Sequence, residues 1–196
     1  MSHKHSSHDH DASEAKHGAA AGDVSPASAK HHHRESASVS VAVVVITVSD
    51  TRTLETDTGG ALVAEMLDKA GHKPSARNIV PDEPAAIESA TREALASVGV
   101  GAVILTGGTG VAPRDVTPES VEPLLERIIP GFGELFRQLS YEDIGSAALL
   151  SRATAGLANG KVVFVIPGSR GAVKLAMEKL ILPELGHLAA EAVKTR

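Results

Sequence analysis

The sequence of 196 residues contains no cysteine and no tryptophan, and its other aromatic residues are one tyrosine and three phenylalanines. The absence of cysteine excludes disulfides, thiol nucleophiles, iron–sulfur clusters and cysteine-based zinc sites. The scarcity of aromatic side chains argues against the base-stacking platforms of nucleic-acid-binding proteins. The longest apolar run, Val41–Ile46, is far shorter than the roughly 18 residues of a transmembrane helix, and the N-terminus has no apolar signal-peptide core. We therefore expect a cytoplasmic protein with no membrane partner.

Basic residues are fewer than acidic residues. The chain has 19 Lys and Arg against 24 Asp and Glu, which gives a formal net charge of −5. Nucleic acids are bound by clustered Lys and Arg, so we expect no nucleic-acid partner. The length and the 42% of hydrophobic residues suffice for one globular domain with a core. A ligand is expected to be held mainly by backbone amides and small polar side chains.

Residues 1–40 differ in composition from the rest of the chain. They are rich in His, Ser, Ala and Asp, and they contain eight of the ten histidines but few large aliphatic residues. Such a segment cannot bury enough apolar surface to offset the entropy lost on ordering, and we predict a disordered His-rich tail. The histidines could bind Ni²⁺, Zn²⁺ or Cu²⁺ transiently. A tail that is only solvated is the favoured interpretation, because the spacing of the histidines matches no closed tetrahedral site.

From Val41 onward, apolar runs alternate with segments of helical periodicity. The run Val41–Val48 is continuous and β-branched, which is typical of a strand buried on both faces in a parallel sheet. The alternation predicts an α/β fold over residues 41–196 as a single domain, a three-layer sandwich whose mostly parallel central sheet is flanked by helices. The expected strands are Val41–Val48, Lys73–Val80, Gly101–Leu105 and Lys161–Ile166, and the expected helices are Thr58–Ala70, Pro84–Val98, Gly171–Leu182 and Glu184–Lys194, with Thr117–Leu150 mostly helical.

Three polar or glycine-rich loops each follow one of the apolar strands. They are Ser49-Asp50, Thr106–Gly110 and Pro167–Ser169. Ligands of parallel sheets bind at the carboxyl ends of the strands. Because all three loops leave such ends, we expect them to meet at one edge of the sheet and to form the functional site.

The glycine-rich loop Thr106–Gly110 has two interpretations. Its glycines, Gly107, Gly108 and Gly110, permit positive φ angles and a close approach of the backbone to a ligand. Amides exposed in such a loop can form a concave anion site. The loop has neither the lysine of a Walker loop nor the spacing of a dinucleotide fingerprint. A tight turn and a phosphate cradle both remain open.

Several aspartates lie near these loops. Asp115 comes just before a predicted helix start, beside the glycine-rich loop, where it could hold Mg²⁺ against phosphate oxygens or only cap local amides. Asp82 follows a predicted strand, but aspartate also suits the start of the next helix. The same ambiguity applies to Asp50 and Asp57.

Other polar residues are weaker candidates for the functional site. Ser169 is expected to cap the helix that follows it, and a helix N-terminus can bind an anion. Ser151 and Arg152 lie in a polar break, where the arginine could contact a phosphate or a carboxylate. His72 and His187 have no partner at the spacing of metal ligands, and we expect both at the surface.

Taken together, the motifs occur in the order seen in one family. The sequence resembles the MogA/MoaB-type molybdopterin adenylyltransferases of molybdenum cofactor biosynthesis, whose relatives include the amino-terminal domain of gephyrin. The resemblance runs from about Val41 to the C-terminus, and the compact ending is more similar to the MoaB branch. The motifs are Ser49–Arg52, Asp57–Gly59, Pro81–Glu83, Thr106–Gly110, Pro113–Glu119, Pro130–Glu134, Leu150–Arg152 and Pro167–Ser169.

The resemblance implies a reaction and a set of residues. Molybdopterin and ATP are the implied substrates and Mg²⁺ the implied cofactor, with adenylyl-molybdopterin and pyrophosphate as products. Carried over by motif, Asp82 and Asp115 are the catalytic, Mg²⁺-binding aspartates. The substrate-binding residues implied are Ser49, Asp50, Asp57, Thr106, Gly107, Gly108, Thr109, Gly110, Arg114, Ser151, Arg152, Gly168 and Ser169.

The resemblance also implies partners. Family relatives form trimers, and MoaB-like members often form hexamers, so a homotrimer or homohexamer is expected. The enzyme that inserts molybdate is the implied recipient of the product. A non-catalytic molybdopterin-binding carrier or scaffold is the alternative function, and the presence of both Asp82 and Asp115 favours the enzyme.

Overall fold

Apolar, β-branched runs form the middle of a six-stranded sheet in the computed structural model, which describes Met1 and residues 39–194. The predicted tail over residues 1–40 thus lies outside the described residues, apart from Met1, Val39 and Ser40. The strand order is β2-β1-β3-β6-β5-β4, parallel from β2 to β6 and antiparallel from β6 to β4. The strands are β1 (Ala42–Val48), β2 (Lys73–Val80), β3 (Ala102–Thr106), β4 (Arg127–Ile128), β5 (Thr154–Ala158) and β6 (Lys161–Ile166).

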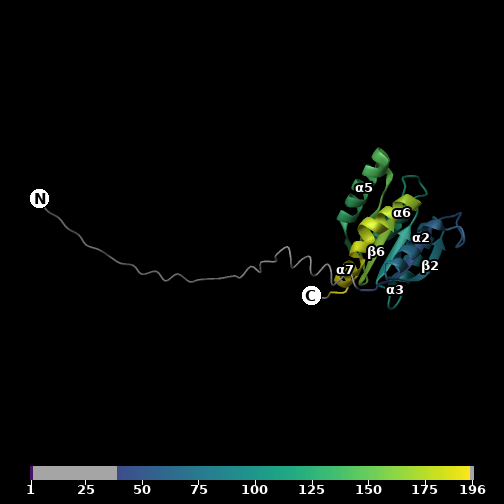
Figure 1. Cartoon of the computed structure of the whole chain (residues 1–196), viewed down its shortest axis with the longest axis horizontal. Coiled ribbons are helices and arrows are strands. Elements are labelled where there is room, and N and C mark those ends of the chain that lie inside the picture. The colour runs from purple at the N-terminus through teal and green to yellow at the C-terminus, as the bar shows by residue number, and fades with distance from the viewer. Residues whose placement is uncertain (2–38, 195–196) are drawn as a thin grey trace.

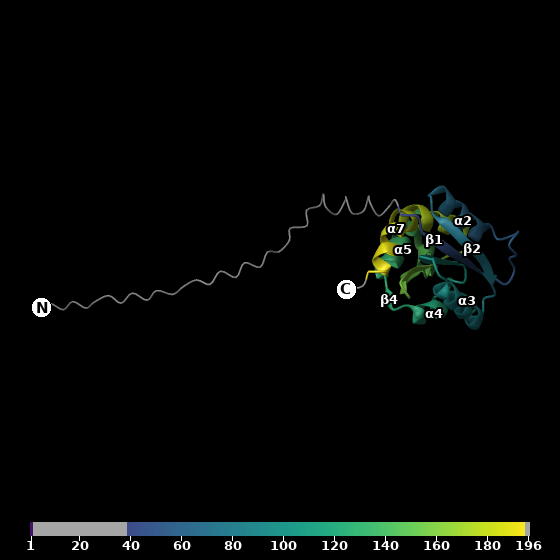
Figure 2. The same ribbon diagram turned by 90° about the horizontal axis from the view of Figure 1, so that it is seen from below.

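Helices cover both faces of this sheet (Figures 1 and 2). Side chains of β1 alternate between two cores: Val43 and Val45 pack on one face, and Val44 and Ile46 on the other. The first face carries α2 (Thr58–Lys69), α5 (Pro130–Ile144), α6 (Arg170–Ala176) and α7 (Leu182–Ala192), and the second carries α3 (Pro84–Ala96) and α4 (Thr117–Val121). The predicted three-layer α/β architecture is confirmed.

Two strands were not expected from the sequence. The weakly apolar stretch Thr154–Ala158 is β5, and it forms a hairpin with β6 through Asn159-Gly160. Both turn residues have positive φ, 49° and 66°, which is the backbone that an Asn-Gly pair favours between antiparallel strands. The two-residue β4 lies within Thr117–Leu150, which is mostly helical as expected, through α4, η1 (Glu122–Leu124), α5 and η2 (Gly145–Leu150).

The closing helices run on without the break expected between Leu182 and Glu184. A π-helical turn, η3 (Met177–Ile181), joins α6 to α7. Pro183 lies in the first turn of α7 and cannot donate the usual backbone hydrogen bond. The wider π-helical turn η3, just before Pro183, accommodates the missing hydrogen bond, so that the chain continues as a helix. None of the helices in residues 39–194 is long and apolar enough to cross a bilayer.

His72 is buried, which corrects the expectation of a surface position. It lies between α2 and β2, and its Nδ1 accepts a hydrogen bond from the backbone N–H of Val41 (3.2 Å) at the start of the core. Burial lowers the pKa of His72. His187 is partly buried on α7, with its Nδ1 3.3 Å from Glu184 and its Nε2 3.5 Å from Glu191.

The burial of His72 predicts an acid-sensitive stability. The folded-state pKa lies below the unfolded value of about 6.5, so the unfolded chain binds the proton more tightly and stability falls as pH drops below that value. His72→Gln keeps an acceptor for the Val41 N–H but does not titrate. Urea unfolding between about pH 7.5 and pH 5 should show a steeper loss of unfolding free energy for the wild type than for this variant. Parallel curves would contradict this account.

Candidate functional site

The loops that follow β1, β3 and β6 meet at one edge of the sheet, because these three strands are parallel neighbours. The Gly107 N–H donates to the Ile166 carbonyl (3.1 Å), and the Thr106 hydroxyl donates to the Pro167 carbonyl (3.3 Å). A cavity of about 110 Å³ opens between the three strand ends and the N-terminus of α2. Its lining includes Thr47, Ser49, Arg52, Asp57, Gly59, Thr106, Gly107 and Gly168.

The backbone of the glycine-rich loop passes too close to its neighbours at Gly107 and Gly108 for a side chain to fit there. Gly107 has φ +105°, and a Cβ there would lie 2.4 Å from the carbonyl oxygen of Val48. Gly108 has φ +61°, and a Cβ there would lie 2.3 Å from Thr117 Oγ1 and 3.0 Å from Asp82 Oδ1. Both the left-handed backbone and the lack of space therefore require glycine.

Three carbonyl groups of this loop accept hydrogen bonds from other parts of the chain. The Gly108 carbonyl accepts from the Thr117 N–H (3.0 Å), and the Thr109 carbonyl accepts from the Arg152 N–H (3.3 Å). The Gly110 carbonyl accepts from Arg152 Nε (2.8 Å). In a trans peptide the next N–H points opposite to the carbonyl. The amides of residues 109–111 therefore each point away from the donor that binds the preceding carbonyl, and they are candidate donors for an anion site.

Asp82 and Asp115 lie beside this loop, although they come from different connections. Asp82 Oδ1 faces Gly108, and Asp115 Oδ2 lies 2.6 Å from where a Cβ of Gly110 would be. Asp115 Oδ2 also accepts from the Ala112 N–H (2.9 Å). Burial raises the pKa of Asp82, and the charge of Asp115 raises it further. Two carboxylates that repel each other in this way favour a cation between them.

The donor set fits Mg²⁺ held together with phosphate oxygens. Within the described residues, no three His, Cys, Asp or Glu side chains form a group that could hold a metal. Mg²⁺, however, commonly takes only one or two carboxylates and completes its shell with water and phosphate oxygens. Thr117 Oγ1 is buried beside Asp82 and has no hydrogen-bond partner. This oxygen is a further polar group that a bound ligand or water can satisfy.

Arg152 holds the glycine-rich loop in place. Its Nε donates to the Gly110 carbonyl, its Nη2 donates to the Asp115 carbonyl, and its Nη1 forms an ion pair with Glu119. The guanidinium thus ties the loop to the segment that carries Asp115. Arg152 and Ser151 also line a larger cavity, of about 480 Å³, beside the N-terminus of α5.

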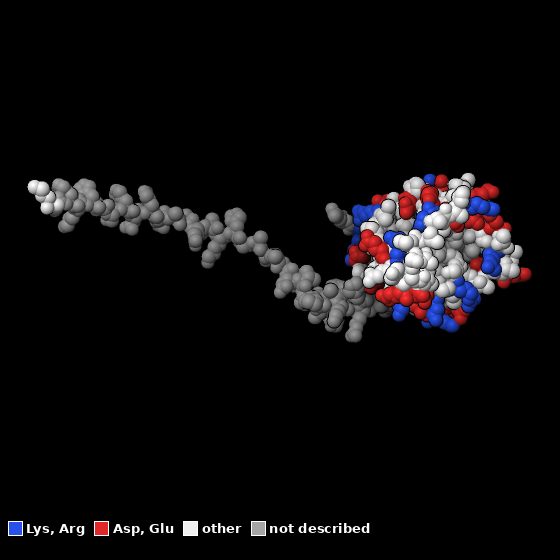
Figure 3. Space-filling model, turned by 90° about the horizontal axis from the view of Figure 1, so that it is seen from above, with Lys and Arg blue, Asp and Glu red and all other residues white. Residues whose placement is uncertain are grey.

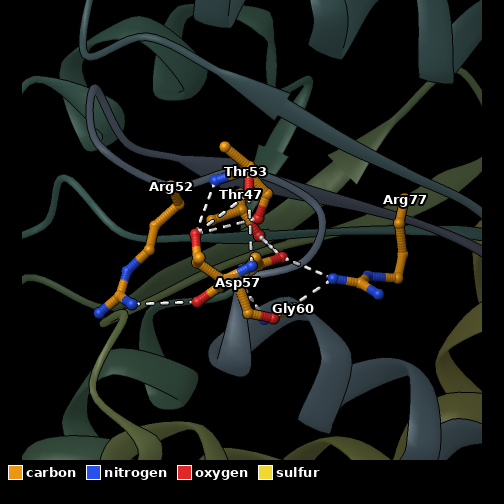
Figure 4. A network of polar contacts seen from close by, with 7 residues as sticks. Thr47, Arg52, Thr53, Asp57, Gly60 and Arg77 are labelled. Atoms are coloured by element: carbon orange, nitrogen blue, oxygen red, sulfur yellow. Dashed lines mark hydrogen bonds and ion pairs between the residues drawn. The ribbon is translucent and has the colours of Figure 1, made fainter.

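The carboxylate of Asp57 forms hydrogen bonds and an ion pair with other residues of the chain (Figure 4). Its buried carboxylate caps α2 by accepting from the Gly60 N–H (2.8 Å), and it also accepts from Thr47 Oγ1 (2.9 Å) and Arg77 Nη2 (2.9 Å). Burial alone would raise the pKa of Asp57, but these hydrogen bonds and the Arg77 charge outweigh burial and lower it. Arg52 lies on the opposite side of Asp57 from Arg77, and its Nη1 donates to the Thr56 carbonyl (3.0 Å).

The other predicted site residues lie around the same edge. Ser169 caps α6 as expected, by accepting from the Ala172 N–H (3.3 Å). A Cβ on Gly168 would lie 3.2 Å from Gly107 Cα, so the third loop packs on the glycine-rich loop. Ser151 and Ser169 line a further cavity of about 130 Å³ between α5 and α6. Sequence reasoning did not assign Thr47, Arg77 or Thr117 to the site. Thr117 lies within the motif Pro113–Glu119, whereas Thr47 and Arg77 belong to no motif.

On the face in Figure 3, basic and acidic side chains are interspersed, and no broad basic area is visible there. Asp50 and Arg114, both predicted for the site, form an ion pair with each other.

Comparison with known proteins gives consistent matches. The family model for a probable molybdopterin binding domain matches residues 44–187. Molybdenum cofactor biosynthesis protein B of Halalkalibacterium halodurans is 51% identical over 76% of this chain and 88% of its own length, and that of Bacillus subtilis is 53% identical over the same shares. A crystal structure of molybdenum cofactor biosynthesis protein B, 52% identical, superposes with a TM-score of 0.77 over 79% of this chain and 96% of that one. The tungsten cofactor synthesizing protein MoaB from Pyrococcus furiosus, 40% identical, gives 0.72 over 79% and 98%.

A glycine substitution tests the crowding at the loop. Gly108 and Gly160 have similar φ, +61° and +66°, but a Cβ on Gly160 would meet nothing closer than 3.8 Å. Gly160→Ala should cost only the left-handed backbone strain, about 1–2 kcal/mol of unfolding free energy. Gly108→Ala should cost more, about 3 kcal/mol, because it also displaces Thr117 Oγ1 and Asp82. Equal losses in urea unfolding would show that the loop is not crowded.

Proposed function

Because the chain belongs to the family of the probable molybdopterin binding domain, together with molybdenum cofactor biosynthesis protein B, we propose that it is a molybdopterin adenylyltransferase. In this reaction the terminal phosphate of molybdopterin attacks the α-phosphorus of ATP. A new phosphorus–oxygen bond forms to the α-phosphorus, and the bond from it to the β-phosphate oxygen breaks. The products are adenylyl-molybdopterin and pyrophosphate.

The convergence of Asp82 and Asp115 on the glycine-rich loop is the observation that carries this proposal. In the proposal these two carboxylates hold Mg²⁺, and the metal, when bound, supplies positive charge that offsets the triphosphate. The amides of residues 109–111 receive phosphate oxygens on the side of the loop away from Arg152. Carboxylates and amides that flank one loop match the two needs of a nucleotide phosphate, a cation and hydrogen-bond donors.

The chain's own part in catalysis is positioning. A phosphate nucleophile is already an anion at neutral pH, so no general base is required, and holding the reactants in line provides most of the acceleration. Rigid support for this comes from the Arg152 hydrogen bonds to the Gly110 and Asp115 carbonyls. The cavities that contain Ser49, Ser151, Ser169 and Gly168 are the proposed sites of the pterin and the nucleoside.

A homotrimer or homohexamer, and transfer of the product to the molybdate-inserting enzyme, belong to the same proposal. Exposed apolar side chains at the end of α5 and in η2 support association with another chain. They are Tyr141, Ile144, Leu149 and Leu150. Native mass spectrometry of the purified protein decides between monomer, trimer and hexamer.

Removing either acidic side chain should stop the reaction. We expect Asp82→Asn and Asp115→Asn each to lower kcat/KM at least about 100-fold, or about 2.7 kcal/mol of transition-state stabilisation. Asp68→Asn changes an exposed carboxylate on α2 and should leave the rate unchanged. The measurement is pyrophosphate released from Mg-ATP and molybdopterin, with the mass of the product as confirmation.

Two results would count against this proposal. Full turnover by both active-site variants would remove the aspartates from the mechanism. Binding of molybdopterin by the wild type without any pyrophosphate release would favour the carrier or scaffold function instead.

A further inference from the structure

Asp50 connects the two loops that carry Asp82 and Asp115. Its Oδ1 accepts a hydrogen bond from the backbone N–H of Asp82 (3.1 Å). Its Oδ2 forms an ion pair with Nη2 of Arg114, the residue just before Asp115. One carboxylate thus contacts both acidic loops, and neither contact involves the carboxylates of Asp82 or Asp115.

Asp50 is well placed to act as an anchor because it follows the central part of the sheet. It comes two residues after the end of β1, which pairs with β2 through Val48 and Val80 and with β3 through Thr47 and Thr106. The Ser49 N–H donates to the Val80 carbonyl (2.8 Å), which fixes the start of this loop to the end of β2. Asp82 follows β2, and the glycine-rich loop follows β3.

The segment before Asp115 needs such an anchor. Residues 111–114 are exposed, and within residues 39–194 the Asp115 carboxylate accepts a hydrogen bond from Ala112 alone, in the same turn. Arg152 holds the Asp115 carbonyl from the side of β5, and the Arg114–Asp50 pair holds the segment from the side of β1. Without the second contact, the repulsion between the two carboxylates would act on a loop held from one side only.

We propose that Asp50 is a positioning residue that sets the separation of Asp82 and Asp115 and does not itself bind substrate. This rests on the proposed function, and it refines the expectation that Asp50 lines the substrate pocket. Asp50 is 30% exposed and Arg114 is 72% exposed, and ion pairs so open to solvent contribute little to folding. Loss of Asp50 should therefore change metal use far more than stability.

The first test is a Mg²⁺ titration of pyrophosphate release. Asp50→Ala should raise the Mg²⁺ concentration for half-maximal activity about tenfold or more, as loss of a residue that orients metal ligands does. Excess Mg²⁺ should restore most of kcat, and the KM for each substrate at saturating Mg²⁺ should stay near the wild-type value. The midpoint of thermal unfolding should not move. Glu55→Gln, an exposed carboxylate of the same loop, is the matched control.

A conservative variant separates the two contacts of Asp50. Asp50→Asn keeps an acceptor for the Asp82 N–H but loses the charge that pairs with Arg114, so its effect should be smaller than that of Asp50→Ala. Arg114→Gln should match Asp50→Asn, and the double variant should be no worse than either, because all three remove the same pair. Additive losses, an increased substrate KM at saturating Mg²⁺, or an unchanged Mg²⁺ requirement would each overturn the proposal.

Hydrogen–deuterium exchange tests the anchor without requiring activity. Asp50→Ala should speed exchange in both segments 81–84 and 111–116, whereas Arg114→Gln should affect only 111–116. If the wild type makes no pyrophosphate but exchange changes in this way, the proposed reaction fails and the anchor stands. Exchange unaltered by Asp50→Ala would overturn the anchor even in an active enzyme.

Discussion

The site depends on three glycines whose neighbours leave no room for a side chain. At Gly107, Gly108 and Gly110, a Cβ would collide with the Val48 carbonyl, with Thr117 and Asp82, or with Asp115. The contacts at Gly108 and Gly110 bring two carboxylates against one loop, and the same tight path turns the loop's carbonyls toward Arg152 and Thr117. Two acidic groups and the backbone amides of residues 109–111 then lie around one short stretch of chain, and a metal–nucleotide phosphate needs groups of both kinds.

Most other charged groups near the site hold the structure together. Asp57 is satisfied by Gly60, Thr47 and Arg77, and Arg152 is satisfied by backbone carbonyls and Glu119. Such internally paired groups fix loops that have little apolar surface of their own, because a part-buried charge must find partners. Asp82 differs from them, since burial and a like charge raise its pKa. A perturbed carboxylate of this kind, next to a second carboxylate and a glycine-rich loop, is typical of a functional site.

The sequence predicted the layers and the meeting of three loops at one edge of the sheet, because both follow from strand order. Continuous apolar runs such as Val41–Val48 identify central parallel strands, and loops after such strands meet at one edge. The hairpin strand Thr154–Ala158 was missed because its small residues lack alternation, although Asn159-Gly160 was an available signal. Side-chain partners such as Arg77 for Asp57 depend on tertiary contacts that no local pattern encodes. The burial of His72 has the same origin.

The family relationship identifies the relatives of this chain. The proposed adenylyl transfer depends in addition on where the phosphates of ATP would bind. A crystal structure with Mg²⁺ and a non-hydrolysable ATP analogue tests this most directly. We expect phosphate oxygens on the amides of residues 109–111 and a metal ion that contacts both Asp82 and Asp115. A triphosphate bound elsewhere, with neither aspartate in the metal's coordination shell, would contradict it.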